Sequence, residues 1–349
     1  MDAPPAAPSA PSRPKGGLAL LAALQRYRES SVVLVLIVLC VALYFSPAHA
    51  TFYSRANLQN LLLQIALLSV FAIGETIVII TGGIDLSLGS LIAFSGMVLA
   101  LAVTQMNARM YTGVAIGGAI VIALLVSVAV GAFHATLVHR LRLPPFVVTL
   151  ASLTILRSQS LLMNRQLPIS LSDFPFLTNL ANGRLFERSV FPIPVPVVIV
   201  GLIAIVVHLL LKYARIGRYL YSVGSNEQAT RLSGVNVGRV KLFAYGASAL
   251  LGGVAGILYA GYGGQGDPLS GGGYELNAVA AAVIGGTDLR GGQGSIAGTL
   301  LGACLLNVIL SGINLTIANP SLWEGTVVGG VLLLAVLTTA LQQRNKTNA

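Results

Sequence analysis

The sequence predicts an all-α integral membrane protein with about ten transmembrane helices, some of them glycine-broken or re-entrant. Of its 349 residues, 55% are hydrophobic and only 9% are charged, and the mean hydropathy is +0.83. These values lie outside the usual range of soluble globular proteins. The apolar runs are also continuous and often about 20 residues long, which is the length that crosses a bilayer as a helix. A membrane β-barrel would instead show alternating segments of about ten residues.

The expected helices follow from these runs in chain order. The eighth run is short, and the pair of runs on either side of Asp85 is also compatible with a single re-entrant hairpin. We expect spans at about 31–46, 58–81, 85–106, 112–138, 145–163, 191–211, 242–263, 275–287, 294–314 and 322–341.

Lysine and arginine residues orient these spans. With the N-terminus in the cytoplasm and an even number of spans, 15 cations lie in inward segments and five in outward ones, and Arg157 lies within a span. This asymmetry satisfies the positive-inside rule. The net charge of +10 is therefore explained by the cations that orient the chain among membrane lipids, and no nucleic acid partner is expected.

Composition also divides the chain into three parts. Residues 1–28 are rich in Pro and Ala and predict a disordered cytoplasmic tail. Residues 29–342 form the transmembrane domain, with its most polar inward segment at 212–241, which we call the cytoplasmic loop. Residues 343–349 form a cytoplasmic C-terminal tail.

Two similar stretches break the apolar runs about two hundred residues apart. IITGGIDLSLGSLIA, ending at Ala93, is matched by VIGGTDLRGGQGSIA, ending at Ala297. Glycine-interrupted segments at corresponding places in two halves of a transporter point to a translocation pathway. The candidate pathway or helix-break residues are Gly82, Gly83, Asp85, Gly285, Gly286 and Asp288.

The acidic residues near these breaks have two interpretations each. Irregular backbone at membrane depth requires protein or water around it. Asp85 and Asp288 are expected to cap the helices that restart, because a carboxylate accepts free N–H groups and complements the positive end of the helix dipole; lining the pathway is the alternative. Glu75 lies within an apolar run, where an unpaired charge is costly, so it has a pathway or interhelical role or is a neutral structural carboxyl.

The glycines after Asp288 do not form a nucleotide site. GGQGS lacks the Gly-Lys-Ser/Thr ending of a phosphate loop and follows no predicted parallel strand. Cys40 and Cys304 lie in apolar runs, which argues against a disulfide framework, and no metal-ligand spacing is present. We therefore expect no catalytic residue, metal or cofactor in this chain.

The cytoplasmic loop contains a candidate docking helix. Residues 225–232 predict a short helix capped by Ser225, with Gln228 at the capping-box position and Gly234 ending it. Such a helix is too short to cross a membrane. It is suited to dock in a groove of another protein, and an ordinary solvated loop is the alternative.

Several segments resemble the permeases of bacterial ribose, xylose, arabinose and galactose ABC importers. They are FAIGETIVIITGGIDLSLGSLIAFSGM, LRLPPFVVTLASLTILR, IGRYLYSVGSNEQATRLSGVNVGRVKLFAYGASALLGGVAGIL and GYELNAVAAAVIGGTDLRGGQGSIAGTLLGA. The similarity runs in order from about Asn57 to Leu337. It implies a permease subunit of the bacterial inner membrane that moves a monosaccharide or a similar neutral polyhydroxylated solute from periplasm to cytoplasm.

The resemblance also implies the partners. Such a permease pairs with a second permease chain, identical or different, receives solute from a periplasmic binding protein, and contacts an ATPase subunit that binds ATP-Mg. The segment from Ser225 to Val237 matches the ATPase-coupling segment of the family. The resemblance therefore implies that the ATPase meets Asn226, Glu227, Ala229, Ser233 and Gly234, and Arg231, four residues after Glu227, shares its helix face.

Other functions fit the sequence less well than sugar import. His134-Ala135 replaces the usual Asn-Gly of the family, and Ser158 and Glu75 also depart from its pattern, which leaves the solute open. Branched-chain amino acid permeases are distant relatives, but a charged solute would need more fixed charge in the spans. A secondary transporter or channel would be expected to carry a relay of membrane acids or histidines. An intramembrane enzyme would need a catalytic constellation, and none is present in the predicted spans.

Overall fold

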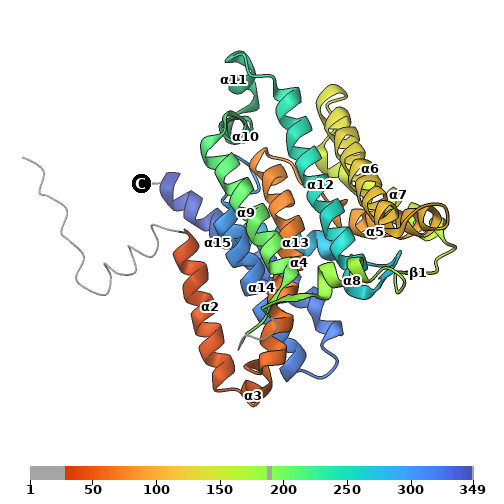
Figure 1. Ribbon diagram of the computed structural model, residues 1–349. Coiled ribbons are helices and arrows are strands. Elements are labelled where there is room, and N and C mark those ends of the chain that lie inside the picture. The colour runs from red at the N-terminus through yellow and green to blue at the C-terminus, as the bar shows by residue number, and fades with distance from the viewer. Residues whose placement is uncertain (1–27, 187–190, 348–349) are drawn as a thin grey trace, which may run out of the picture.

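The computed structural model describes residues 28–186 and 191–347, and Figure 1 labels its elements. Apart from Arg28, the expected N-terminal tail lies outside the described residues. The helices are α2 (Arg28–Tyr44), α3 (His49–Phe52), α4 (Arg55–Ile80), α5 (Leu88–Asn107), α6 (Thr112–Arg140), α7 (Pro145–Met163), α8 (Pro175–Asn182), α9 (Val195–Tyr213), α10 (Arg215–Ser225), α11 (Glu227–Leu232), α12 (Val237–Gly263), α13 (Tyr274–Ile284), α14 (Ile296–Thr316) and α15 (Ser321–Thr347).

The all-α membrane fold is confirmed. Within the described residues, α4, α5, α6, α7, α9, α12 and α14 are seven helices long and apolar enough to cross a membrane, and three shorter apolar helices lie in α2, α13 and α15. Together they are consistent with about ten spans. The C-terminal helix α15 continues to Thr347, through most of the segment expected to be a tail.

The sequence leaves the number of spans open in two regions, around Asp85 and at the short eighth run, and the structure differs between them. The runs on either side of Asp85 form separate helices, α4 and α5, each long enough to span the bilayer, so length does not require a re-entrant hairpin. Helix α13 has only 11 residues. At 1.5 Å per residue it covers about 16 Å, roughly half of the hydrocarbon core.

Helix α4 is the centre of the bundle. It packs against α9, α12, α13 and α14, and its apolar window is 89% buried inside the protein. Figure 1 shows α4 surrounded by these later parts of the chain, with α5, α6 and α7 grouped on the other side of α12. Its inner half is almost continuously buried, because side chains all around this helix meet protein rather than lipid.

Short elements mark the two ends of the bundle. At one end, α10 and α11 stand beyond the spans within the cytoplasmic loop, and at the opposite end α3 joins α2 to α4 (Figure 1). The strands have two residues each. β1 (Ile169–Ser170) pairs antiparallel with β4 (Gln265–Gly266), and β2 (Arg184–Leu185) pairs antiparallel with β3 (Ile193–Pro194).

Candidate functional site

The first break ends α4 with a left-handed glycine. Gly82 has φ +78°, its N–H donates to the Ile79 carbonyl, and the Gly83 N–H donates to the Val78 carbonyl. This pair of bonds is the Schellman arrangement, which satisfies carbonyls at a helix end and favours glycine at the left-handed position. The glycine in the sequence motif is therefore required by the way in which α4 ends.

The second break ends α13 in the same way, but one residue out of register. Here the left-handed residue is the second glycine of the pair, Gly286, with φ +93°. Its N–H donates to Val283, and the Thr287 N–H donates to Ala282. The two motifs thus share a turn geometry although their Gly-Gly-x-Asp letters do not superimpose on it.

The two breaks touch each other inside the protein. A Cβ atom on Gly291 would lie 2.7 Å from the Gly82 nitrogen, and one on Gly82 would lie 3.4 Å from the Arg290 carbonyl oxygen. The Gly292 N–H also donates to the Ile80 carbonyl, over 2.8 Å. Segments two hundred residues apart therefore form one junction, which we call the break junction (residues 80–87 and 285–294).

Neither aspartate is the N-cap of the helix that follows. Asp85 Oδ1 accepts the Ser87 N–H (3.1 Å) and the Ser87 hydroxyl (2.6 Å), whereas Asp288 Oδ1 accepts the Arg290 N–H (3.0 Å). Each carboxylate therefore stabilises the turn two residues ahead of it. Asp288 lies too far ahead of α14 to cap it, since six residues separate it from Ser295, and the Ser295 side chain caps α14 by accepting the Gly298 N–H. Ser87, the residue before α5, makes no side-chain cap.

Glu75 supports the first break from within α4. It is fully buried, and its Oε1 accepts the Asp85 N–H at 3.1 Å. The second Asp85 oxygen faces the Ser248 hydroxyl at 3.4 Å, and buried His134 and Tyr245 lie nearby with ring centroids 6.3 Å apart. Glu75 and Asp85 thus bond to backbone and hydroxyl groups at the inner end of α4, which is an interhelical arrangement.

The cytoplasmic loop folds as two helices rather than one. An 11-residue helix, α10, which the sequence pattern does not predict, precedes the short helix α11. The cap of α11 is Asn226, whose Oδ1 accepts the Ala229 N–H at 2.9 Å, and not Ser225, which closes α10. Ser225 cannot serve as the cap because it is still helical and its hydroxyl donates back to the Tyr221 carbonyl.

Glu227 fixes α11 to the rest of the protein. Its Oε1 pairs with Arg231 at 2.8 Å, and its Oε2 pairs with Lys241 of α12 at 2.7 Å. Burial alone would raise the pKa of Glu227, but hydrogen bonds and charge from Lys241 and Arg231 outweigh burial, so the pKa lies below its ordinary value. A single carboxylate therefore holds two cations, one on each helix.

The lowered pKa predicts how α11 responds to acid. The stabilisation from Glu227 should be complete above the ordinary glutamate pKa of about 4.3 and should be lost as the pH falls through the lowered value. Amide protection factors in α11 should be constant from pH 7 to pH 5 and fall by up to about fivefold below pH 4, as expected for solvent-exposed ion pairs. Hydrogen exchange by mass spectrometry measures this. If Glu227→Gln shows the same acid-dependent loss, another group is responsible.

Helix α10 connects α11 to the break junction. The Thr230 hydroxyl of α11 donates to the Ser222 carbonyl of α10 at 2.8 Å. The Tyr221 hydroxyl then donates to the Gly294 carbonyl at 2.9 Å, and Gly224 packs directly on the Ile80 carbonyl and the Gly292 nitrogen. Contacts therefore run without a gap from the exposed tip of the loop to both breaks.

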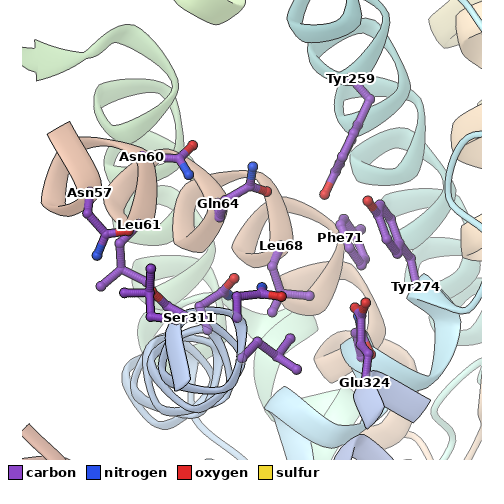
Figure 2. Close-up of a pocket in the computed structure, with 15 residues that line it drawn as sticks. Asn57, Asn60, Leu61, Gln64, Leu68, Phe71, Tyr259, Tyr274, Ser311 and Glu324 are labelled. Atoms are coloured by element: carbon purple, nitrogen blue, oxygen red, sulfur yellow. The ribbon is translucent and has the colours of Figure 1, made fainter. Parts of the chain in front are cut away.

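A polar pocket lies at the other end of α4. It has a volume of about 250 Å³ and lies among α4, α12, α13, α14 and α15. Figure 2 shows Asn60 and Gln64 on α4, with Phe71, Tyr259 and Tyr274 together at one end of the pocket. The side of α4 that carries these residues begins at the α3 end of the bundle, away from the cytoplasmic loop. We call this cavity the outer pocket.

The structure brings some of the predicted residues together and leaves others apart. Gly82 contacts the segment 285–294, which carries Gly285, Gly286 and Asp288. Glu75 and Asp85 bond to each other beside this contact, and Gly83 packs against Tyr245. The residues on or beside α11 are Asn226, Glu227, Ala229, Arg231, Ser233 and Gly234. None of these residues lines the outer pocket. The pocket had one sequence signal, because Asn57, Asn60 and Gln64 recur at helical spacing at the start of an apolar run.

The spans, the break junction and the cytoplasmic helices together define a multi-pass membrane permease. The family described as "Branched-chain amino acid transport system / permease component" matches residues 57–337. The chain belongs to this family.

Individual relatives agree with that assignment. The ribose import permease protein RbsC of Escherichia coli strain K12 is 36% identical over 316 residues, 90% of this chain and 94% of that protein. RbsC of Bacillus subtilis strain 168 is 34% identical, over 84% of this chain and 87% of that protein. The D-allose transport system permease protein AlsC of E. coli K12 is 30% identical, over 86% and 88%. No solved structure matches the chain.

Membership of this family defines the role of the chain within a transporter. It is the permease component of an ABC transporter, a component that is not itself catalytic, and it is a multi-pass protein of the bacterial inner membrane. As a permease component of an ABC transporter, it implies ATPase and binding-protein partners.

Proposed function

We propose that this chain imports a neutral monosaccharide of the ribose or allose kind, as one of two permease chains served by a periplasmic binding protein. ATP-Mg is bound by a separate ATPase subunit that docks on the cytoplasmic loop. The names of the RbsC and AlsC relatives support the sugar class, because the similarity covers most of each chain.

The observation that carries the docking proposal is the exposed face of α11. Gln228, Ala229 and Leu232 are exposed on this helix, and the Leu232 side chain is 83% exposed although it is apolar. Leu232 is exposed to the cytoplasm on a helix that the ion pairs of Glu227 fix in place, so it is suited to fill an apolar groove of a partner. Large apolar anchors surrounded by polar residues are typical of binding interfaces.

The proposed docking also supplies a route for motion. Force applied to α11 passes through the Thr230–Ser222 hydrogen bond to α10, and α10 contacts both breaks. Since the breaks end α4 and α13, moving α10 tilts the inner ends of two helices at once. Hinge and rocking movements of this kind are the usual basis of alternating access.

Substituting Ala229 tests the docking surface. Ala229→Trp places a bulky ring on the exposed face of α11, outside the bilayer, so insertion into the membrane should be normal. The ATPase should fail to co-purify, and sugar-stimulated ATP hydrolysis should fall at least tenfold. Ala50→Trp, at an exposed alanine of the outward helix α3, is the matched control and should retain the ATPase. Full recovery of the ATPase with Ala229→Trp would show that α11 is only a solvated turn.

The alternative of an ion-driven transporter or channel predicts a different energy source. The membrane acids Glu75 and Asp85 bond to the backbone and hydroxyl groups of one break, which does not extend into a relay across the bilayer. Ribose and allose uptake should therefore be blocked by vanadate and should require the binding protein. Uptake that is insensitive to vanadate and abolished by an uncoupler would contradict the proposal.

A further inference from the structure

The outer pocket has the chemistry of a binding site rather than of a passive channel mouth. Two helices present polar strips that face it, α4 with Asn57, Asn60 and Gln64, and α14 with Asn307, Ser311 and Asn314. The members of each strip are three or four residues apart, so each strip occupies one helix face. Amide side chains that face lipid cost free energy, whereas amides grouped around a cavity have other polar groups beside them.

We propose that the permease itself binds its solute in the outer pocket, and that the pocket selects neutral, polyhydroxylated molecules. This inference rests on the proposed sugar import and adds a selective site within the membrane chain, separate from the binding protein. Six carboxamides line the cavity: Asn57, Asn60, Gln64, Asn277, Asn307 and Asn314.

Carboxamides suit hydroxyl groups because each supplies an acceptor oxygen and two donor hydrogens. A sugar hydroxyl both donates and accepts, so it can use either end of each amide. Among the described residues that line the pocket, none is basic, and Glu324 is the only charged one. A phosphate or carboxylate on the solute would find no cation and would meet this acid, so anionic solutes are disfavoured.

The inner end of the pocket is aromatic. Phe71 and Tyr274 are parallel, with an interplanar angle of 4° and ring centroids 6.0 Å apart, and the centroids of Tyr259 and Tyr274 are 5.1 Å apart. Aromatic faces accept the apolar C–H side of a ligand whose other side makes hydrogen bonds. The volume of about 250 Å³ is also below the range of roughly 300–1,000 Å³ typical of drug-sized ligands, as expected for a monosaccharide.

The chain carries its own reporter for this site. Trp323 is its only tryptophan, is 50% exposed, and directly precedes the pocket residue Glu324 on α15. The full-length permease in lipid nanodiscs, without the binding protein or the ATPase, can therefore be titrated by intrinsic fluorescence. Equilibrium dialysis with radiolabelled sugar measures the same binding if the fluorescence change is small.

The expected result is saturable binding of ribose or allose, with ribose 5-phosphate at least tenfold weaker. Gln64→Leu should weaken sugar binding at least tenfold, because Gln64 faces the cavity with an amide whose Nε2 donates to the Tyr262 hydroxyl at 3.2 Å and whose oxygen can accept from a sugar hydroxyl. Gln105→Leu is the matched control. This glutamine is exposed near the outward end of α5, outside the pocket, and its loss should leave binding unchanged.

Three outcomes would overturn the inference. They are no sugar binding by either method, equal binding in Gln64→Leu and wild type, and tighter binding of choline than of sugar, which would make the aromatic residues and Glu324 a cation site. Each leaves the proposed function intact if binding-protein-dependent, vanadate-sensitive sugar uptake persists. Loss of that uptake in the wild type would instead contradict the proposed function.

Discussion

Replacing Asp85 with leucine should nearly abolish uptake and reduce the amount of folded permease, whereas Asp85→Asn should retain appreciable transport. Asp85 Oδ1 accepts both the N–H and the hydroxyl of Ser87, and its second oxygen faces Ser248. Leucine leaves these groups without an acceptor in a site where Asp85 is fully buried. Each buried polar group orphaned in this way costs about 1–3 kcal/mol, so the expected loss is at least about 3 kcal/mol.

The asparagine variant separates the hydrogen bonds that Asp85 accepts in the turn from its negative charge. An asparagine side chain keeps an oxygen that accepts from Ser87, so the turn before α5 should still form. The measurements are membrane abundance, thermal stability in detergent and vanadate-sensitive sugar uptake, each for both variants. Equal loss of uptake in the two variants, at normal abundance, would mean that the negative charge itself is required.

Gly224→Val should uncouple ATP hydrolysis from transport, lowering uptake at least tenfold. Gly224 lies against the Ile80 carbonyl and the Gly292 nitrogen, where no side chain fits without moving backbone. Displacing α10 breaks the contact path from α11 to the break junction while leaving the exposed face of α11 available to the ATPase. ATP hydrolysis by the assembled complex should therefore persist while sugar accumulation fails.

Two matched comparisons sharpen this test. Gly201→Val introduces the same side chain at a helical glycine of α9 where an added Cβ would meet no packed atom within 4 Å, and it should transport normally. Tyr221→Phe removes only the hydroxyl that donates to Gly294, and it should lower the ratio of sugar transported to ATP hydrolysed, whereas Tyr219→Phe, on the exposed side of α10, should not. Normal coupling in Gly224→Val would show that α10 does not transmit the movement.

The spans were predictable from sequence because lipid demands long apolar runs whatever the tertiary structure. The pairing of IITGGIDLSLGSLIA with VIGGTDLRGGQGSIA was also visible, since both helix ends need a left-handed glycine. The contact between Gly82 and Gly291 was not, because it depends on how α4 and α13 lie in space. Helix α10 was missed because its polar sequence resembles a solvated loop until Tyr221 and Gly224 are seen against the spans.

The outer pocket was the least predictable feature. Its amides come from α4 and, about two hundred residues later, from α13 and α14. The helical spacing of Asn57, Asn60 and Gln64 marks one polar strip, but it does not show that this strip faces α13 and α14. The ion pairs of Glu227 are predictable only in part. Its partner four residues on, Arg231, follows from helical spacing, whereas Lys241 lies on the next helix and required the fold.

The central position of α4 has a consequence for how the protein is made. Apart from α3, every element that packs substantially on α4 begins at residue 193 or later, and α14 is complete only about 240 residues after α4 ends. At roughly 5–20 residues per second, α4 waits on the order of 10–50 seconds for its neighbours. During synthesis it holds Glu75 and the amides Asn60 and Gln64 without their final surroundings. Chains that stop before α12 are therefore expected to remain with the insertion machinery or to be removed by membrane proteases.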